Sequence, residues 1–281
     1  MAYLLSSLRR HAAAVLGLVI IAAVMITAIF GSYFSPYDPE AMDLGNRVKP
    51  PAWMKGGDWR HFLGTDMFGK DVLSRLICGT RETIVVGITS SVIALVLGVI
   101  LGMLSGYLGG IFDISVMRLV DIMLALPPVM IAIVLVAAIG PHSISIILAM
   151  GLTMWSEYAK VIRSRTLSLK EETFILASKV LGASHLRVVF KHILPNIIYI
   201  LIVTFTLQIG TIILWATSLS FMGLGGVTLS WGWDISAGRS YISTAWWLST
   251  LPGLAIFVTI LGFNLFGEWL RDVLDPSLGK I

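Results

Sequence analysis

Long apolar runs without charged residues follow one another along the chain. A helix that crosses a bilayer needs about 20 mostly apolar residues, and five runs reach that length: 11–37, 83–112, 122–156, 196–222 and 246–267. The third run is long enough for two helices and is interrupted by a short turn at Gly140-Pro141-His142. The pattern therefore predicts six transmembrane helices and an all-α integral membrane protein.

These helices divide the chain into three parts. Residues 1–33 hold an N-terminal tail and the first transmembrane helix. Its apolar stretch is too long for a signal peptide, and no small-x-small cleavage site clearly follows it. Residues 34–81 form an extracytoplasmic loop, whose four prolines before residue 52 predict an extended start. Residues 82–281 form a core of five helices, with a polar loop at 163–195 between the fourth and fifth.

The distribution of basic residues orients the protein. An even number of spans puts both termini on one side, and that side carries twelve of the 20 Lys and Arg residues. Seven of the twelve lie between Lys160 and Lys191. Because cytoplasmic loops are enriched in Lys and Arg, both termini and the 163–195 loop are expected in the cytoplasm.

Composition excludes several classes of protein. Hydrophobic residues make up 57% of the chain and charged residues 13%, against roughly 25% charged in a soluble domain. This excludes a soluble enzyme and a disordered protein, and the single Cys78 excludes an intrachain disulfide. The net charge of +4 comes without a basic arm, so we expect membrane lipid around the chain and no nucleic-acid partner.

No pattern in the sequence supports catalysis or cofactor binding. Gly64 to Lys70 reads G-x-x-x-x-G-K, but Asp71 occupies the place where a P-loop needs Ser or Thr for magnesium. No buried strand precedes it, and it lies on the outer side, away from ATP. His185 and His192 are seven residues apart without a third metal ligand. We therefore predict no catalytic, cofactor or metal site on this chain.

The loop between the fourth and fifth spans has the signals of two short helices and a turn. Glu172 suits a helix N-terminus, Gly182 can end that helix, and Ser184 can cap the next one. Pro195 fits the first turn of the fifth span. The loop's small residues allow another backbone to approach. These features alone fit a docking surface and an amphipathic segment lying on the membrane equally well.

The same loop resembles the EAA loop of bacterial ABC-importer permeases, whose pattern is E-A-A, three residues, Gly and a later L-P. Leu176 stands where that family usually has Glu, and Ser178 replaces the second Ala. The residues that the resemblance assigns to ATPase coupling are Leu176, Ala177, Ser178, Gly182, Ala183, Ser184, Leu194 and Pro195.

Two other segments resemble one branch of that family. The stretch from His61 to Arg75 is similar to H-x-L-G-T-D-x-x-G-R-D-V-x-S-R, with Lys70 in place of Arg. This signature belongs to the second permease subunit of dipeptide, oligopeptide and nickel importers, and the last third of the chain is similar to that branch as well. The signature residues are Gly64, Thr65, Asp66, Gly69, Asp71 and Arg75.

The resemblance implies a type I ABC importer permease in the inner membrane of a bacterium or archaeon. Its partners would be a second homologous permease, two ATPases that bind ATP and Mg²⁺, and an external substrate-binding protein. Di- or oligopeptides would cross by alternating access. Nickel or a metal chelate is the alternative substrate, and a secondary transporter without an ATPase is a distant alternative. A secondary transporter would carry ionisable residues at mid-membrane depth, and the predicted spans carry almost none there.

Several details of the spans are predicted from spacing. Arg118 and Asp121 are three apart and able to form a structural ion pair, as are Glu157 and Lys160 at the predicted end of the fourth span. Pro127-Pro128 removes two backbone donors and predicts a kink or break. Gly98 and Gly102 form a small-xxx-small pair that we interpret as ordinary helix packing.

Overall fold

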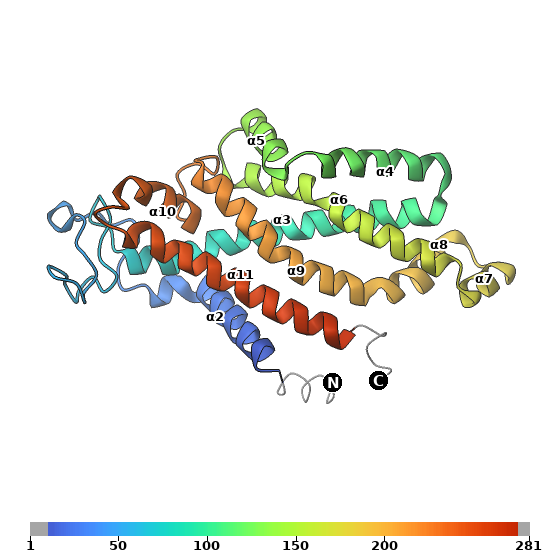
Figure 1. Ribbon diagram of the computed structural model, residues 1–281, viewed down its shortest axis with the longest axis horizontal. Coiled ribbons are helices and arrows are strands. Elements are labelled where there is room, and N and C mark those ends of the chain that lie inside the picture. The colour runs from blue at the N-terminus through green and yellow to red at the C-terminus, as the bar shows by residue number, and fades with distance from the viewer. Residues whose placement is uncertain (1–10, 275–281) are drawn as a thin grey trace.

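The computed structural model describes residues 11–274 as an elongated bundle of helices (Figure 1). Within this range the only bridge between extended segments pairs Thr65 with Asp71. The longer helices are α2 (Ala12–Phe34), α3 (Val72–Leu108), α4 (Gly110–Ala125), α5 (Pro128–Ile139), α6 (Ser143–Lys170), α9 (Leu194–Phe221) and α11 (Trp247–Leu274). The shorter ones are η1 (Leu44–Asn46), α7 (Thr173–Val180), α8 (His185–Arg187), the π-helix η2 (Val188–Ile193), α10 (Trp231–Gly238) and η3 (Arg239–Tyr241).

The centre of the bundle is the pair α3 and α6, which pack along most of their length. Their backbones approach at glycines. A Cβ on Gly98 would lie 2.7 Å from the Trp155 carbonyl oxygen, and one on Gly102 would lie 2.5 Å from the Ala159 carbonyl oxygen. The packing interpretation of the two glycines is therefore confirmed.

The remaining helices surround this pair. α2 and α11 pack on each other and lie together along one side of the bundle, whereas α4 and α5 lie along the other (Figure 1). The largest apolar cluster joins residues of α3, α5, α6 and α9, among them Ala94, Ala132, Met150 and Ile212. The residues 34–71 gather with α10 at one end of the bundle, and α7 and α8 lie at the opposite end (Figure 1).

The number of spans is not confirmed at six. Among the described residues, four helices are long and apolar enough to cross a membrane, namely α2, α3, the run His185–Phe221 and α11. The pair α4 and α5 makes a fifth if it counts as one span. α6 has 28 residues, but charged side chains in its second half lower its hydropathy.

Helix boundaries differ from the sequence prediction in several places. The second span starts at Val72 instead of residue 83, because Asp71 caps it, so the outer loop ends ten residues early. The third begins at Gly110 and breaks before Pro128 with a bend of 97°. That break confirms the prediction from Pro127-Pro128.

The fifth span also begins earlier than predicted. Pro195 lies in the first turn of α9, as predicted. However, α8 and η2 precede it in one helical run from His185 to Phe221. The preceding turns are the π-helix η2. A proline ring collides with the carbonyl four residues earlier in a regular α-helix, and the wider π turns before Pro195 relieve that collision.

Candidate functional site

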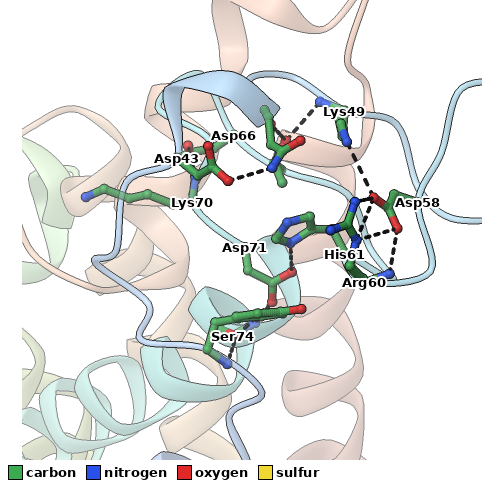
Figure 2. Close-up of polar contacts among 12 residues, drawn as sticks. Asp43, Lys49, Asp58, Arg60, His61, Asp66, Lys70, Asp71 and Ser74 are labelled. Atoms are coloured by element: carbon green, nitrogen blue, oxygen red, sulfur yellow. Dashed lines mark hydrogen bonds and ion pairs between the residues drawn. The ribbon is translucent and has the colours of Figure 1, made fainter.

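The outer signature is held together by buried polar contacts (Figure 2). Asp71 caps α3 by accepting hydrogen bonds from the Ser74 N–H (2.8 Å) and hydroxyl (2.7 Å). Its other oxygen lies 3.0 Å from His61 Nδ1, and His61 and Asp71 are both buried. The carboxylate lies between His and Ser, unlike a catalytic triad, in which the imidazole lies between the other two. Asp71 therefore fastens the loop to α3.

Other signature residues shape the loop itself. Gly69 has φ +76°, and a Cβ there would lie 1.8 Å from the Asp43 carbonyl oxygen, so only glycine fits. The buried Thr65 hydroxyl donates to the Asn46 carbonyl (2.5 Å). One Asp66 carboxylate oxygen accepts from the N–H groups of Phe68 (2.8 Å) and Lys70 (2.9 Å). Gly64 also has positive φ, +84°.

Arg75 joins three distant parts of the chain. Its Nε and Nη2 donate to Oδ1 of Asp234 on α10, at 3.0 Å and 2.6 Å. Its Nη1 donates to Glu40 Oε1 at 2.9 Å, and Glu40 also pairs with Lys70. No sequence pattern singles out Asp234, which is 159 residues from Arg75.

Burial and neighbouring charges together set the pKa values of this cluster. Burial raises the pKa of Asp234 to about 6, against the opposing effect of Arg75. Partial burial raises the pKa of Glu40, but Lys70 and Arg75 lower it more, so it lies below its usual value. The charged side chains of Asp66, Lys70, Arg75 and Asp234 line a cavity of about 420 Å³ beside α10 and α11.

The loop at the opposite end contains the predicted helix, turn and helix. α7 ends before Gly182, which has φ +82°, and the Ser184 hydroxyl accepts from the Arg187 N–H (3.4 Å) at the start of α8. Both capping predictions are confirmed. Leu176, Ala177, Gly182, Ser184 and Pro195 are exposed there, whereas Ser178, Ala183 and Leu194 are half-buried.

The loop predicted at 163–195 is shorter, because α6 continues to Lys170 and α9 begins at Leu194. We call the residues between them, 171–193, the coupling loop. Its inner face is fully packed: Ile175 of α7 and Val188 and Ile193 of η2 are completely buried against α3, α6 and α9. Its outer face is apolar and open, because Val180 and Leu181 are each 87% exposed and Leu186 is 72% exposed. Such an exposed apolar patch is typical of a binding surface.

A polar contact connects the coupling loop to the end of α3. The Tyr107 hydroxyl lies 2.8 Å from His185 Nδ1, and the Lys179 ammonium group lies 5.5 Å from the centre of the Tyr107 ring. The second histidine, His192, packs instead on the Phe174 ring. The two histidines therefore serve separate contacts.

Two predicted ion pairs are wrong. No ion pair joins Arg118 to Asp121 in the described part of the chain. Instead Arg163 of α6 reaches Asp113 of α4 with two hydrogen bonds, of 2.5 and 2.6 Å, because α4 and α6 pack side by side.

The second wrong pair was expected between Glu157 and Lys160. Glu157 accepts a hydrogen bond from Gln208 of α9 instead. α6 continues through both residues to Lys170, so Glu157 lies at the middle of the helix, and the prediction that placed it at the end of a span is corrected.

Comparison with known proteins identifies the family. Residues 98–280 match the binding-protein-dependent transport system inner membrane component, and residues 2–51 match the N-terminal TM domain of oligopeptide transport permease C.

Individual relatives cover almost the whole chain. The dipeptide transport system permease protein DppC of Escherichia coli (strain K12) is 43% identical over 96% of this chain and 91% of that protein. The di/tripeptide transport system permease protein DppC of Pseudomonas aeruginosa (strain UCBPP-PA14) is 39% identical over 93% and 87%. The nickel transport system permease protein NikC of Escherichia coli (strain K12) is 37% identical over 94% of each chain. The chain therefore belongs to the inner membrane components of binding-protein-dependent transport systems, in the branch of the dipeptide, oligopeptide and nickel permeases.

Proposed function

We propose that this chain is one of two permease subunits of an ATP-driven importer that carries di- or oligopeptides across the inner membrane. It carries out no chemical reaction itself. Two ATPase subunits bind ATP and Mg²⁺, a second homologous permease completes the path, and an external binding protein delivers the peptide. Both termini and the coupling loop face the cytoplasm.

The coupling loop is the observation that carries this proposal. A segment lying on the membrane would bury its apolar side chains in lipid next to the spans. Here the inner apolar face already packs on α3, α6 and α9. The exposed Val180, Leu181 and Leu186 belong to α7, α8 and the turn between them, and these helices lie at the far end of the bundle (Figure 1). A cleft on an ATPase would cover them.

Contacts of the coupling loop would also transmit movement of the ATPases to the transmembrane helices. Closure of the ATPase pair on ATP would move α7, and the buried contacts of Ile175 together with the Tyr107–His185 contact would pass the motion to α3. The uninterrupted helix from His185 to Phe221 would carry it into the membrane through α9. Packed helices that shift as rigid bodies then open the path to alternate sides.

The peptide substrate is supported by the relatives, since the two DppC proteins are named for dipeptide or di/tripeptide transport. The NikC relative is named for nickel transport, so nickel or a metal chelate is the second candidate.

Uptake into proteoliposomes tests the proposal. The chain, its partner permease and the ATPases are reconstituted, the binding protein is added outside, and ATP is enclosed. We expect labelled dipeptide to accumulate with ATP and not with a non-hydrolysable analogue. Accumulation of radioactive nickel without peptide would favour the second candidate, and peptide accumulation that needs no ATPase would contradict the proposal.

A further inference from the structure

Glu157 of α6 and Gln208 of α9 form a polar pair where the middles of these two helices meet. The Gln208 amide of α9 donates to the Glu157 carboxylate of α6, and both side chains are half-buried. Each residue lies at the middle of a helix of 28 residues. An ionisable residue at such a position is costly and marks a functional site by default.

Neighbouring helices place the pair at depth. Tyr158 and Trp155, which flank Glu157 in the sequence, pack against Gly98 of α3. Gly98 lies near the centre of the apolar part of α3, and Gln208 lies within the uncharged run 196–222 of the chain. Gln208 is therefore far from the charged residues that precede α9, and Glu157 lies one helical turn before Lys160, where the charged half of α6 begins.

Gln208 belongs to a polar row along one face of α9. Thr204, Gln208, Thr211, Trp215 and Ser218 follow one another at intervals of four, three, four and three, the spacing of a single helix face. All of them are half-buried or exposed. The buried face carries Ile209, Ile212 and Ile213. It also carries Thr206 and Thr217, whose hydroxyls donate to backbone carbonyls of α9 itself. Lipid would favour apolar side chains on an exposed face, so this row fits the wall of a hydrated path.

The carboxylate has unused capacity for a cation. Glu157 accepts one hydrogen bond from a neutral amide, whereas a carboxylate has room for about four. No Lys or Arg lies within ion-pair distance of it in residues 11–274, and Lys160 on the same helix is exposed. A negative charge in a medium of low dielectric is strongly stabilised by a cation that comes into contact with it.

We propose that Glu157 binds the N-terminal ammonium group of the peptide during its passage and that Gln208 holds the carboxylate between passages. The inference rests on the proposed peptide-import function. Every di- and oligopeptide with a free N-terminus carries this group whatever its side chains, so one carboxylate serves a broad range of sequences.

The test measures how much the transporter discriminates in favour of the ammonium group. Proteoliposomes with the complete complex take up alanyl-alanine or lactyl-alanine, in which a hydroxyl group replaces the ammonium group, each at saturating concentration. The ratio of the two uptake rates is compared between wild type and Glu157→Gln. Wild type and variant use the same binding protein, so its preference for one substrate affects both ratios equally. Differences in the amount of complex affect both uptake rates equally and leave each ratio unchanged.

We expect the ratio to fall about tenfold in Glu157→Gln, which corresponds to about 1.4 kcal/mol. Lys160→Gln removes a charge three residues away and should leave the ratio unchanged. Gln208→Leu keeps the carboxylate and should also keep the ratio. If Glu157→Gln does not assemble, Glu157→Asp should lower the ratio by an intermediate factor.

The outcomes separate the inference from the function. An unchanged ratio in Glu157→Gln, with normal peptide uptake by wild type, overturns the role of Glu157 and leaves the importer intact. If Glu157→Gln leaves the ratio unchanged but abolishes nickel uptake, the Glu157–Gln208 pair serves a metal cation and the peptide role is overturned. A wild-type complex that takes up no peptide overturns both proposals.

Discussion

Arg75 shows how one signature residue organises the outer end of the protein. Its guanidinium group contacts Asp234 of α10 and Glu40 of the outer loop while its backbone belongs to α3. Arg75 and Asp234 are both largely shielded from water. Removing one partner of such a buried pair leaves an uncompensated charge and costs about 3–5 kcal/mol. The family's Arg at this position thus holds loop, span and α10 in one arrangement.

Asp234 should make stability depend on pH. Its pKa is about 6 in the folded protein, against an ordinary 3.8. Between these values the folded chain keeps a proton that the unfolded chain has released, so stability falls as pH rises from about 4 to about 6. At roughly 1.4 kcal/mol per pKa unit, the free energy of unfolding falls by about 3 kcal/mol at most over this pH range. We expect Asp234→Asn to remove this loss, measured as unfolding temperature in detergent.

Glu40 provides the control for that measurement. Its pKa lies below the ordinary value, so its contribution has the opposite sign: it is present above about pH 4.5 and is lost as pH falls. The Glu40→Gln variant should therefore still lose stability as pH rises from 4 to 6. If Asp234→Asn keeps the wild-type pH profile, the carboxyl is not protonated in this range.

At the scale of elements, the contact between α3 and α6 depends on glycine. A Cβ at Gly102 would lie 2.5 Å from the Ala159 carbonyl oxygen, too close for the backbones to stay in place. We expect Gly102→Ala to destabilise the protein by about 1–3 kcal/mol through overpacking, seen as a lower unfolding temperature.

Gly253 of α11 is the matched control, because a Cβ there would meet no atom within 4 Å. The same change, Gly253→Ala, should leave stability unchanged or raise it by up to about 1 kcal/mol, since alanine favours helix. Equal effects of the two substitutions would show that α3 and α6 do not pack closely at Gly102.

Local chemistry explains which elements could be predicted from sequence. Pro127-Pro128 must interrupt a helix, and Gly182 suits a left-handed helix end, so both features appeared where expected. The length of α6 was missed because its apolar pattern stops near Ser156. The Lys and Arg residues that follow are good helix formers, and nothing among them breaks the helix before Lys170.

Long-range pairs escaped prediction for a different reason. Arg75 and Asp234, Asp113 and Arg163, and Glu157 and Gln208 meet only after the helices have packed. Spacing rules compare residues within one helix, and this is why they suggested Arg118 with Asp121 and Glu157 with Lys160. The polar row on α9 could have been found from sequence, because its spacing is that of one helix face.

The whole molecule has two specialised ends joined by continuous helices. The outer loop, residues 34–71, lies with α10 at one end, and α7 and α8 of the coupling loop lie at the other (Figure 1). α3 reaches from Asp71, its cap in the signature loop, to Tyr107, which contacts the coupling loop. α9 extends from the coupling loop to the opposite end. This arrangement fits the proposed function, in which one end would meet the binding protein and the other the ATPases.

Co-purification of the ATPases tests the central claim most directly. The tagged chain is expressed with its partner permease and the ATPases, and wild type is compared with Leu181→Glu. Leu181 is 87% exposed, so the change adds a charge to the proposed docking face without disturbing the packed side. Leu181→Glu is preferable to a change at Gly182, whose positive φ would add strain to any side chain.

Val227→Glu is the matched control, since Val227 is 83% exposed between α9 and α10 at the other end of the bundle. The expected result is that wild type and Val227→Glu retain the ATPases, whereas Leu181→Glu loses at least about nine-tenths of them, a tenfold weakening or about 1.4 kcal/mol. Equal retention by all three proteins, or no ATPase with wild type when the partner permease is present, would contradict the coupling loop as the docking site.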